Sequence, residues 1–126
     1  MTVMHAQLGA SVRFSKTVGE GDIHLFAGLS RDLSQNHTDD EFMKHSIYGR
    51  RIAHGALLIS FMSTASTRPI EQSLAKGSDT TRVSLGYDGV RFLKAVYIND
   101  TIAVTYTIDG IDLKPLRTTA KIAVKN

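Results

Sequence analysis

The feature that most constrains this chain is an apolar run from Ile52 to Thr67, which is apolar on nearly every side when wound into a helix. A helix that is apolar all round is typically buried in the core. The run is shorter than the roughly 20 apolar residues that a membrane helix needs. Because the residue before a proline avoids helical geometry, Pro69 predicts that the helix ends ahead of it. We therefore expect a buried helix from about Gly55 to Thr67, and no membrane partner.

Two shorter helices are predicted ahead of the buried one. Asp22 stands at a cap position for a helix that should end near Asp32. Thr38 and Glu41 form a capping-box pattern, which predicts a second helix that should end near His45. The stretch between the two helices is polar and is expected to be a loop.

Alternating apolar and polar residues predict β-strands on both sides of these helices. The alternation covers residues 11–15 before the helices, and residues 83–92, 102–108 and 120–124 after them. Its parity changes at Asp88-Gly89, which indicates a β-bulge or a sharp bend. Strands with one polar face favour an antiparallel sheet, and only the apolar helix can cover its other face. We predict one domain over residues 1–126 with an α+β hotdog fold, in which an antiparallel β-sheet wraps around one buried central helix.

Composition narrows the class of protein further. The chain has no cysteine, which excludes a disulfide framework, a thiolate metal site and a cysteine nucleophile. Its 15 basic and 12 acidic residues form no basic run with interleaved aromatics, so no nucleic-acid partner is expected. The first residues lack the pattern of a secretory signal, and a cytoplasmic location is expected.

Asp32 and His37 are the first candidates for chemistry. Histidine is easily poised for proton transfer near neutral pH, and a nearby carboxylate can orient it or share the handling of a water. Both residues belong to one short loop between helices, so their side chains can approach each other. The spacing by itself is not diagnostic and favours a turn-capping aspartate and a solvated histidine.

The pair His54-Gly55 opens the buried helix. A helix N-terminus offers unpaired N–H groups and a positive field, which suit an oxyanion or a thioester carbonyl, and glycine allows a ligand close to the backbone. The alternative is that Gly55 serves only packing and that His54 is a satisfied boundary histidine. No metal site is expected, because the histidines and acids here show no metal-binding spacing and Asp39-Asp40 are explained by the helix start.

Taken together, these residues resemble the MaoC-like dehydratases, the family of (R)-specific enoyl-CoA hydratases. The family signature runs approximately F-A-x-L-S-x-D-x-N-P-x-H-x-D, followed after a spacer by G-x-x-I-A-H-G-M-L-x-x-S. This chain reads Phe26 to Asp32 as FAGLSRD, then His37-Thr38-Asp39, then Gly49 to Leu58 as GRRIAHGALL, and Ser60. The match covers about a third of the chain with the spacing preserved, and residues 91–100 are similar to a later family segment, F-x-x-P-V-x-x-G-D.

The resemblance implies a hotdog enzyme that acts on an acyl thioester of coenzyme A or of a carrier protein. Asp32 and His37 match the catalytic pair that activates a water, and the N–H of Gly55 matches the group that polarises the thioester carbonyl. Ser63 matches a serine that supports the catalytic loop in some members. The resemblance also implies a homodimer or higher homo-oligomer, and no cofactor apart from the coenzyme A or acyl carrier of the substrate. Open alternatives are an acyl-thioester hydrolase and a non-catalytic acyl-thioester-binding module.

The chain departs from the family pattern at two places. Ser34-Gln35 replaces the family's Asn-Pro, which removes a fixed φ angle and changes the hydrogen bonds of the loop. Asn36, next to His37, is expected to compensate for part of this loss. Ala95 and Asn99 replace the proline and glycine of the later segment. These changes favour a specialised acyl group over a simple short chain.

Overall fold

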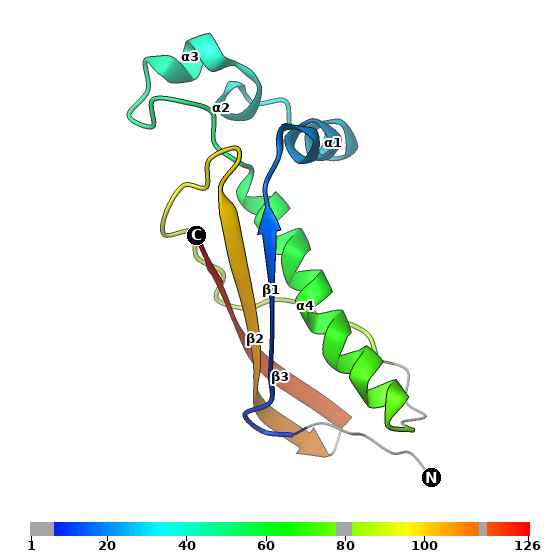
Figure 1. Cartoon of the computed structure of the whole chain (residues 1–126). Helices are drawn as coiled ribbons and strands as arrows, with labels where there is room; N and C mark the ends of the chain where they lie inside the picture. Colours follow the sequence, from blue (N-terminus) through cyan, green and yellow to red (C-terminus); the bar gives the residue numbers. More distant parts are fainter. Residues whose placement is uncertain (1–6, 78–81, 114–115) are drawn as a thin grey trace. The chain divides into compact units, whose positions relative to one another are not determined.

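The computed structural model describes residues 7–77, 82–113 and 116–126. The elements, in chain order, are β1 (Ser11–Thr17), α1 (Glu20–Ser30), α2 (Gln35–Thr38), α3 (Asp40–Lys44), α4 (Gly55–Ala75), β2 (Thr101–Leu113) and β3 (Leu116–Lys125) (Figure 1). Within these ranges, no helix combines the length and apolar character needed to cross a bilayer.

The strands form one sheet in the order β1-β2-β3. β2 and β3 pair antiparallel, with Tyr106 opposite Ile122, and the register shifts between Ile108 and Gly110. This shift is a bulge near the far end of β2, and it lets the long hairpin bend. The strands predicted at residues 11–15, 102–108 and 120–124 are therefore confirmed, and each extends beyond the alternating pattern.

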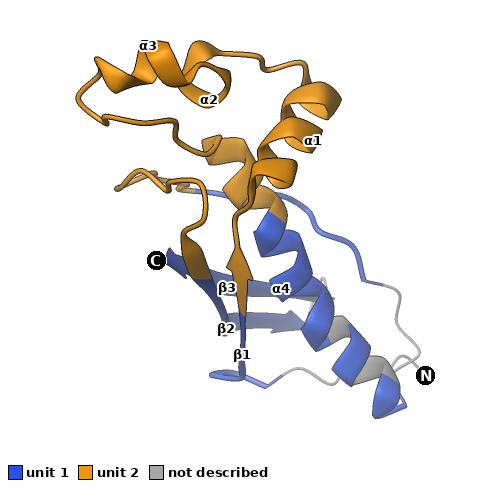
Figure 2. Ribbon diagram, turned by 45° about the horizontal axis from the view of Figure 1, so that its top comes forward, with its two compact units in different colours: residues 1–14, 61–88, 103–125 blue, residues 15–60, 89–102, 126 orange. Residues whose placement is uncertain are grey.

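Two compact units can be distinguished by their internal contacts (Figure 2). The first consists of residues 1–14, 61–88 and 103–125, and the second of residues 15–60, 89–102 and 126. Buried side chains of the first unit include Ala65 and Val104. The second unit buries, among others, Val18, Ile23, Ala27, Met43, Val96 and Ile102, and it contains the predicted catalytic loop.

Helix α4 begins at Gly55, as predicted, but the prediction that it ends before Pro69 is wrong. The helix continues through Pro69 to Ala75. Proline has a φ angle near −65°, which is compatible with a helix, and its cost is the loss of one hydrogen bond and a clash with a preceding carbonyl. α4 continues despite this cost, with Pro69 in its second half.

Burial of α4 is one-sided in the single chain. Leu57, Leu58 and Ala65 are buried, whereas Ala56 and Ser60 are exposed. The all-round apolar pattern therefore predicted the helix and its inner face correctly, but not the exposure of its other side.

The helix caps differ from those predicted. Gly19 caps α1, and Asp22 lies at the third helical position, where its carboxylate accepts the Gly19 N–H at 2.8 Å. That bond holds the pKa of Asp22 below its ordinary value. Asp39, not Thr38, caps α3 and accepts the Phe42 N–H at 2.9 Å, because Thr38 is already the last residue of α2.

The strand predicted over residues 83–92 is not formed in the described part of the chain. Val83 and Leu85 are 73% and 72% exposed. A segment with an alternating pattern forms a strand only if a neighbouring strand supplies hydrogen bonds. The single chain does not provide that neighbour here. The bend predicted at Asp88-Gly89 is present, since Gly89 has a φ angle of +63°.

Candidate active site

Asp32 lies directly after α1, where the chain turns sharply. Arg31 caps the helix in the left-handed region, with φ of 65° and ψ of 16°. The Asp32 N–H then donates to Ser30 Oγ at 3.1 Å, and Asp32 Oδ1 accepts the Ser34 N–H at 3.3 Å. These local bonds turn the Asp32 carboxylate back over the loop that follows.

His37 is held by a helix of a single turn. Ser34 caps α2 by accepting the Asn36 N–H, and its carbonyl accepts the N–H groups of His37 and Thr38. The imidazole Nδ1 lies 2.8 Å from the Ile52 carbonyl oxygen. A carbonyl can only accept, so Nδ1 carries the hydrogen and Nε2 keeps a lone pair. This lone pair is the group that a general base requires.

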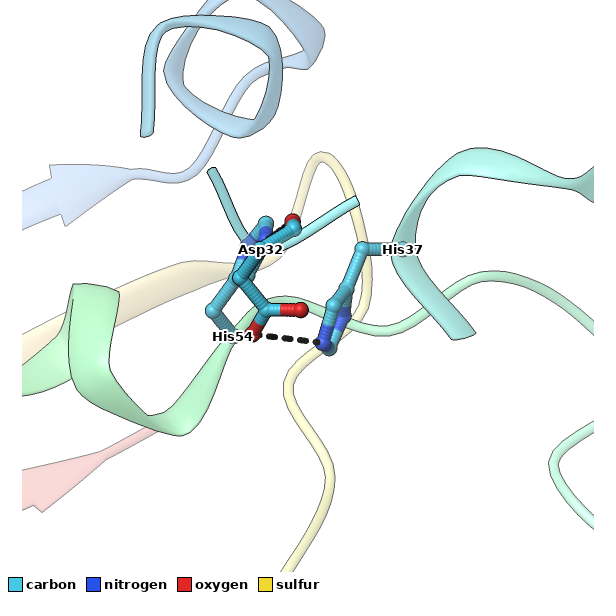
Figure 3. Close-up of side chains that lie close together, drawn as sticks. All are labelled: Asp32, His37 and His54. Atoms are coloured by element: carbon cyan, nitrogen blue, oxygen red, sulfur yellow. Dashed lines mark hydrogen bonds and ion pairs between the residues drawn. The ribbon is translucent and has the colours of Figure 1, made fainter. Parts of the chain in front are cut away.

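The Asp32 carboxylate faces the imidazole of His37 (Figure 3). His37 Nε2 and Asp32 Oδ2 are 4.0 Å apart, which is too long for a direct hydrogen bond and leaves room for both atoms to contact one water. The histidine side chain is 11% exposed and the aspartate side chain 52% exposed. A ligand can therefore reach the carboxylate from solvent, while the imidazole of His37 is mostly enclosed.

The segment before α4 provides the fixed wall of the site. The Ile52 N–H donates to the Asn36 carbonyl at 3.1 Å, and the Ala53 N–H donates to the Val96 carbonyl at 2.7 Å. Ile52 also forms a β-bridge with Tyr97. These bonds hold the segment so that the Ile52 carbonyl lies against His37. The next residue but one, His54, is buried.

His54 contacts both members of the pair, which the sequence did not indicate. Its side chain is buried, its Nε2 lies 3.0 Å from the Asp32 carbonyl oxygen, and its ring stacks on that of His37 with centroids 3.7 Å apart. Phe26 of α1 packs edge-on against it at 4.8 Å. No spacing rule predicts a stack between residues 17 positions apart, because only the tertiary fold brings α2 to the start of α4.

Asp32, His37 and His54 also form the one group of possible metal ligands found in the described ranges, with their ligand atoms within 4.8 Å of one another. The planes of the two stacked rings differ by 26°. Lone pairs in nearly parallel ring planes run side by side, whereas a tetrahedral metal site needs them to converge on one point. The arrangement fits a water between carboxylate and imidazole better than a metal ion.

Arg51 ties three elements of the site together. Its guanidinium binds Glu20 of α1 at 2.8 Å and Asp40 of α3 at 2.5 Å, and it donates to the His37 carbonyl of α2 at 3.2 Å. The bond from Arg51 is the main reason that the pKa of Glu20 lies below its ordinary value, and the pKa of Arg51 is raised in turn. Arg51 thereby fixes the main chain that carries His37.

Gly55 is the first residue of α4, so its N–H has no partner within the helix. Its backbone is partly exposed, and the ring of Phe92 lies directly over it. A Cβ atom at this position would come within 2.9 Å of the Phe92 Cζ atom. The Phe92 ring can therefore lie this close only because residue 55 has no side chain.

The other predicted site residues contribute less directly. Asn36 is exposed and acts through its main-chain carbonyl, which accepts the Ile52 N–H. Ser63 is exposed on the part of α4 that belongs to the first unit, and its carbonyl accepts the hydroxyl of Thr67 at 2.9 Å. Its supporting role stays a prediction.

Comparison with known protein families shows the family to which the chain belongs. The model of the MaoC-like domain matches residues 4–126. The chain belongs to this family. This MaoC-like domain is 33% identical over 121 residues to an (R)-specific enoyl-CoA hydratase of Rhodospirillum rubrum, covering 93% of this chain and 78% of the relative.

Solved structures confirm the predicted hotdog fold. The (R)-hydratase of Aeromonas caviae involved in PHA biosynthesis is similar with a TM-score of 0.74 and 27% identity, over 97% of this chain and 88% of that one. A protein of Archaeoglobus fulgidus described as a monoamine oxidase regulatory protein is similar with a TM-score of 0.79 and 32% identity, over 99% and 84% of the two chains.

Both departures of this MaoC-like domain from the family pattern have a structural counterpart. Asn99 replaces a glycine and has a φ angle of +75°, a region that asparagine tolerates better than most residues. In the loop that carries Asp32 and His37, Ser34 replaces the asparagine and caps α2, while the Gln35 side chain donates to Asp39 at 3.4 Å. The loop is therefore held by local hydrogen bonds in place of a proline ring.

Proposed function

We propose that this protein is a hydro-lyase that reversibly adds water across the 2,3-double bond of an acyl thioester, with Asp32 and His37 as its acid/base pair. The observation that carries the proposal is the 4.0 Å separation of Asp32 Oδ2 from a His37 nitrogen that retains its lone pair. The enoyl-CoA hydratases among its relatives support the same reaction class.

In the proposed reaction, a single water molecule donates one hydrogen bond to Asp32 and its other hydrogen bond to Nε2 of His37. Nε2 takes a proton as the water oxygen bonds to C3, and the π electrons of the double bond move toward the thioester carbonyl. The same proton then passes from Nε2 to C2. One water is consumed, its hydroxyl ends on C3 and its hydrogen on C2, and both side chains return to their starting states. Dehydration follows these steps in reverse.

The N–H of Gly55 is the proposed donor to the thioester carbonyl. Negative charge collects on this oxygen as the enolate forms, and a fixed N–H at a helix start stabilises that charge without reorganising. The support for this role is the partly exposed position of Gly55 at the start of α4. Ser63 is proposed to support the loop, as in the related family pattern.

The proposed substrates carry coenzyme A or an acyl carrier, and the protein itself is proposed to need no other cofactor. A homodimer or higher homo-oligomer is part of the proposal. Its support is the exposed apolar chain at Val83, Leu85 and Leu93, which forms no strand in the described residues of one copy. Light scattering coupled to size-exclusion chromatography tests it, and a monomer at micromolar concentration would contradict it.

Two other functions use the same residues differently. A thioester hydrolase would direct the water to the carbonyl carbon and release free thiol, whereas a binding module would hold the thioester without turnover. The bare Nε2 lone pair beside Asp32 favours catalysis over binding alone.

The test is a hydration assay over a panel of 2-enoyl-CoA substrates that differ in chain length and branching, with free thiol followed in parallel. We expect hydration without thiol release, and a loss of at least about 100-fold in kcat for Asp32→Asn and His37→Ala. His45→Gln, at an exposed histidine that pairs with Glu41, serves as the control. Thiol release without hydration supports the hydrolase. Binding retained in a wild-type chain without turnover supports the binding module.

A further inference from the structure

His54 is a buried histidine that the proposed reaction does not use. It is 1% exposed, although histidine is a residue type of only intermediate burial in proteins. Its Nε2 lies 3.0 Å from the Asp32 carbonyl oxygen. Because that oxygen can only accept, Nε2 carries the hydrogen and Nδ1 is left as a bare acceptor.

Nδ1 of His54 is enclosed and has no hydrogen-bond partner in the described part of the chain. A hydrogen on Nδ1 in place of Nε2 would leave an unpartnered N–H in the interior and the Asp32 carbonyl without its donor, which is unfavourable. The ring is therefore held in its Nε2–H form. This makes His54 unsuited to exchanging protons with a substrate, in contrast to His37, whose free nitrogen faces Asp32.

The contacts of His54 reach both halves of the acid/base pair. The Nε2–H bond holds the main chain of Asp32 at the point where the chain leaves the left-handed turn at Arg31. The stack, with ring centroids 3.7 Å apart, limits rotation of the His37 imidazole. One side chain thus restrains the carboxylate through its backbone and the imidazole through its ring face.

We propose that His54 is a positioning residue that sets the separation of the Asp32 carboxylate and the His37 imidazole through these two contacts. The proposal rests on the proposed hydro-lyase function for its effect on turnover. Its structural part, the Nε2–H form of His54 and the restraint on the His37 ring, does not depend on that function.

Three variants of the full chain separate the two contacts. His54→Phe keeps an aromatic ring for the stack but removes the donor to Asp32. His54→Gln keeps an N–H donor at the position of Nε2 but removes the ring. His54→Ala removes both, and His45→Gln is the control at an exposed histidine outside the site.

We expect kcat to fall about 10-fold in His54→Phe and in His54→Gln, and about 100-fold in His54→Ala, since a misplacement of about 1 Å can cost 10²-fold. KM should stay within about twofold, because His54 acts on the chemical step. A His54→Ala variant that retains more than half of the wild-type kcat overturns the proposal. A variant series in which KM rises at constant kcat does so as well.

Nitrogen-15 NMR of the histidine rings provides a readout that does not depend on turnover. In the wild type, we expect the Nε2–H form for His54 and the Nδ1–H form for His37. The His37 Nδ1–H signal should broaden in His54→Gln and remain sharp in His54→Phe. A wild-type His54 in the Nδ1–H form, or His37 signals unchanged in His54→Gln and His54→Ala, overturns the positioning role. If the wild type lacks hydratase activity, the proposed function fails, and the NMR result still decides the role of His54.

Discussion

The ring of Phe92 covers Gly55 so closely that a Cβ atom on residue 55 would lie 2.9 Å from Phe92 Cζ and 3.0 Å from its Cε2. Phe92 is nevertheless 58% exposed. The ring can therefore move, and the space above the Gly55 amide is sensitive to the smallest side chain.

The first prediction concerns this contact. Gly55→Ala should lower kcat/KM at least about 10-fold, because the methyl group pushes the Phe92 ring into the space beside the amide. The thermal midpoint should change by only a few degrees, since the displaced atoms are the far end of an exposed side chain. Steady-state hydration kinetics and a thermal melt measure both quantities.

Gly28→Ala is the matched control, since a Cβ at this position of α1 meets no atom within 4 Å. It should leave kinetics unchanged and stabilise the helix by up to about 1 kcal/mol. If Gly55→Ala turns over as the wild type does, the space above the amide is not part of the site. Adding Phe92→Ala to Gly55→Ala should recover part of the lost activity.

The second prediction concerns Arg51. Arg51→Met should reduce the free energy of unfolding by about 1–2 kcal/mol, because Glu20 and Asp40 lose a shared partner and the His37 carbonyl loses a donor. Arg51→Lys should recover less than half, since a single ammonium cannot replace the fork of the guanidinium. Urea unfolding measures the change.

Arg50→Met is the control for Arg51, because its guanidinium lies 4.1 Å above the centre of the Tyr97 ring. Its loss should cost about 0.5–1 kcal/mol. Equal losses for the Arg50 and Arg51 variants would mean that the ion-pair network contributes nothing beyond one surface contact.

The third prediction tests why asparagine replaces the family glycine at residue 99. Because Asn99 has a φ angle of +75°, Asn99→Gly should change the free energy of unfolding by no more than about 0.5 kcal/mol. Asn99→Val should lower it by about 1–2 kcal/mol. The comparison of the two substitutions in chemical denaturation isolates the backbone effect. A valine variant as stable as the glycine variant would show that residue 99 relaxes out of the left-handed region.

The fourth prediction is the response to acid. The Arg51 guanidinium lowers the pKa of Glu20, and the Gly19 N–H lowers that of Asp22. In both cases the unfolded chain takes up the proton first as the pH falls. The stabilisation is therefore complete above the unfolded pKa values, near 4, and is lost as the pH drops through the lower folded values.

Unfolding measured between pH 6 and pH 2 in the wild type should show this loss below about pH 4. The double variant Glu20→Gln with Asp22→Asn should be less stable near neutral pH and should depend less on pH in the acid range. An unchanged slope in the double variant would assign the acid response to other carboxylates.

Sequence patterns correctly predicted the strands and the helix start that depend on interactions between neighbouring residues. The alternation of residues 102–108 and 120–124 predicted β2 and β3, because each residue's inward or outward position follows from the pleat of its own strand. The start of α4 at Gly55 was predicted for a similar reason. The cap at Thr38 was wrong because Ser34 forms a separate single-turn helix, and two caps in competition are settled by small differences in hydrogen bonding.

The pair Asp32 and His37 could be named from the sequence, but its working geometry could not. The Nδ1–H form of His37 depends on the Ile52 carbonyl, which lies 15 residues away in the chain. The position of Ile52 depends in turn on its bridge to Tyr97, a further 45 residues on. Contacts at such separations leave no periodic trace.

By itself, the sequence determined the hotdog class, the start of the apolar helix and the candidates Asp32, His37 and Gly55, because periodicity and side-chain chemistry are properties of neighbouring residues. Only the tertiary structure decided whether residues 83–92 form a strand. They form none in the described chain, because a strand needs a neighbouring strand for its backbone hydrogen bonds. It also decided the contacts of His54, which is 1% exposed, lies 3.0 Å from the Asp32 carbonyl oxygen through Nε2 and stacks on the ring of His37. A stack and a hydrogen bond between distant residues form only once the chain has folded.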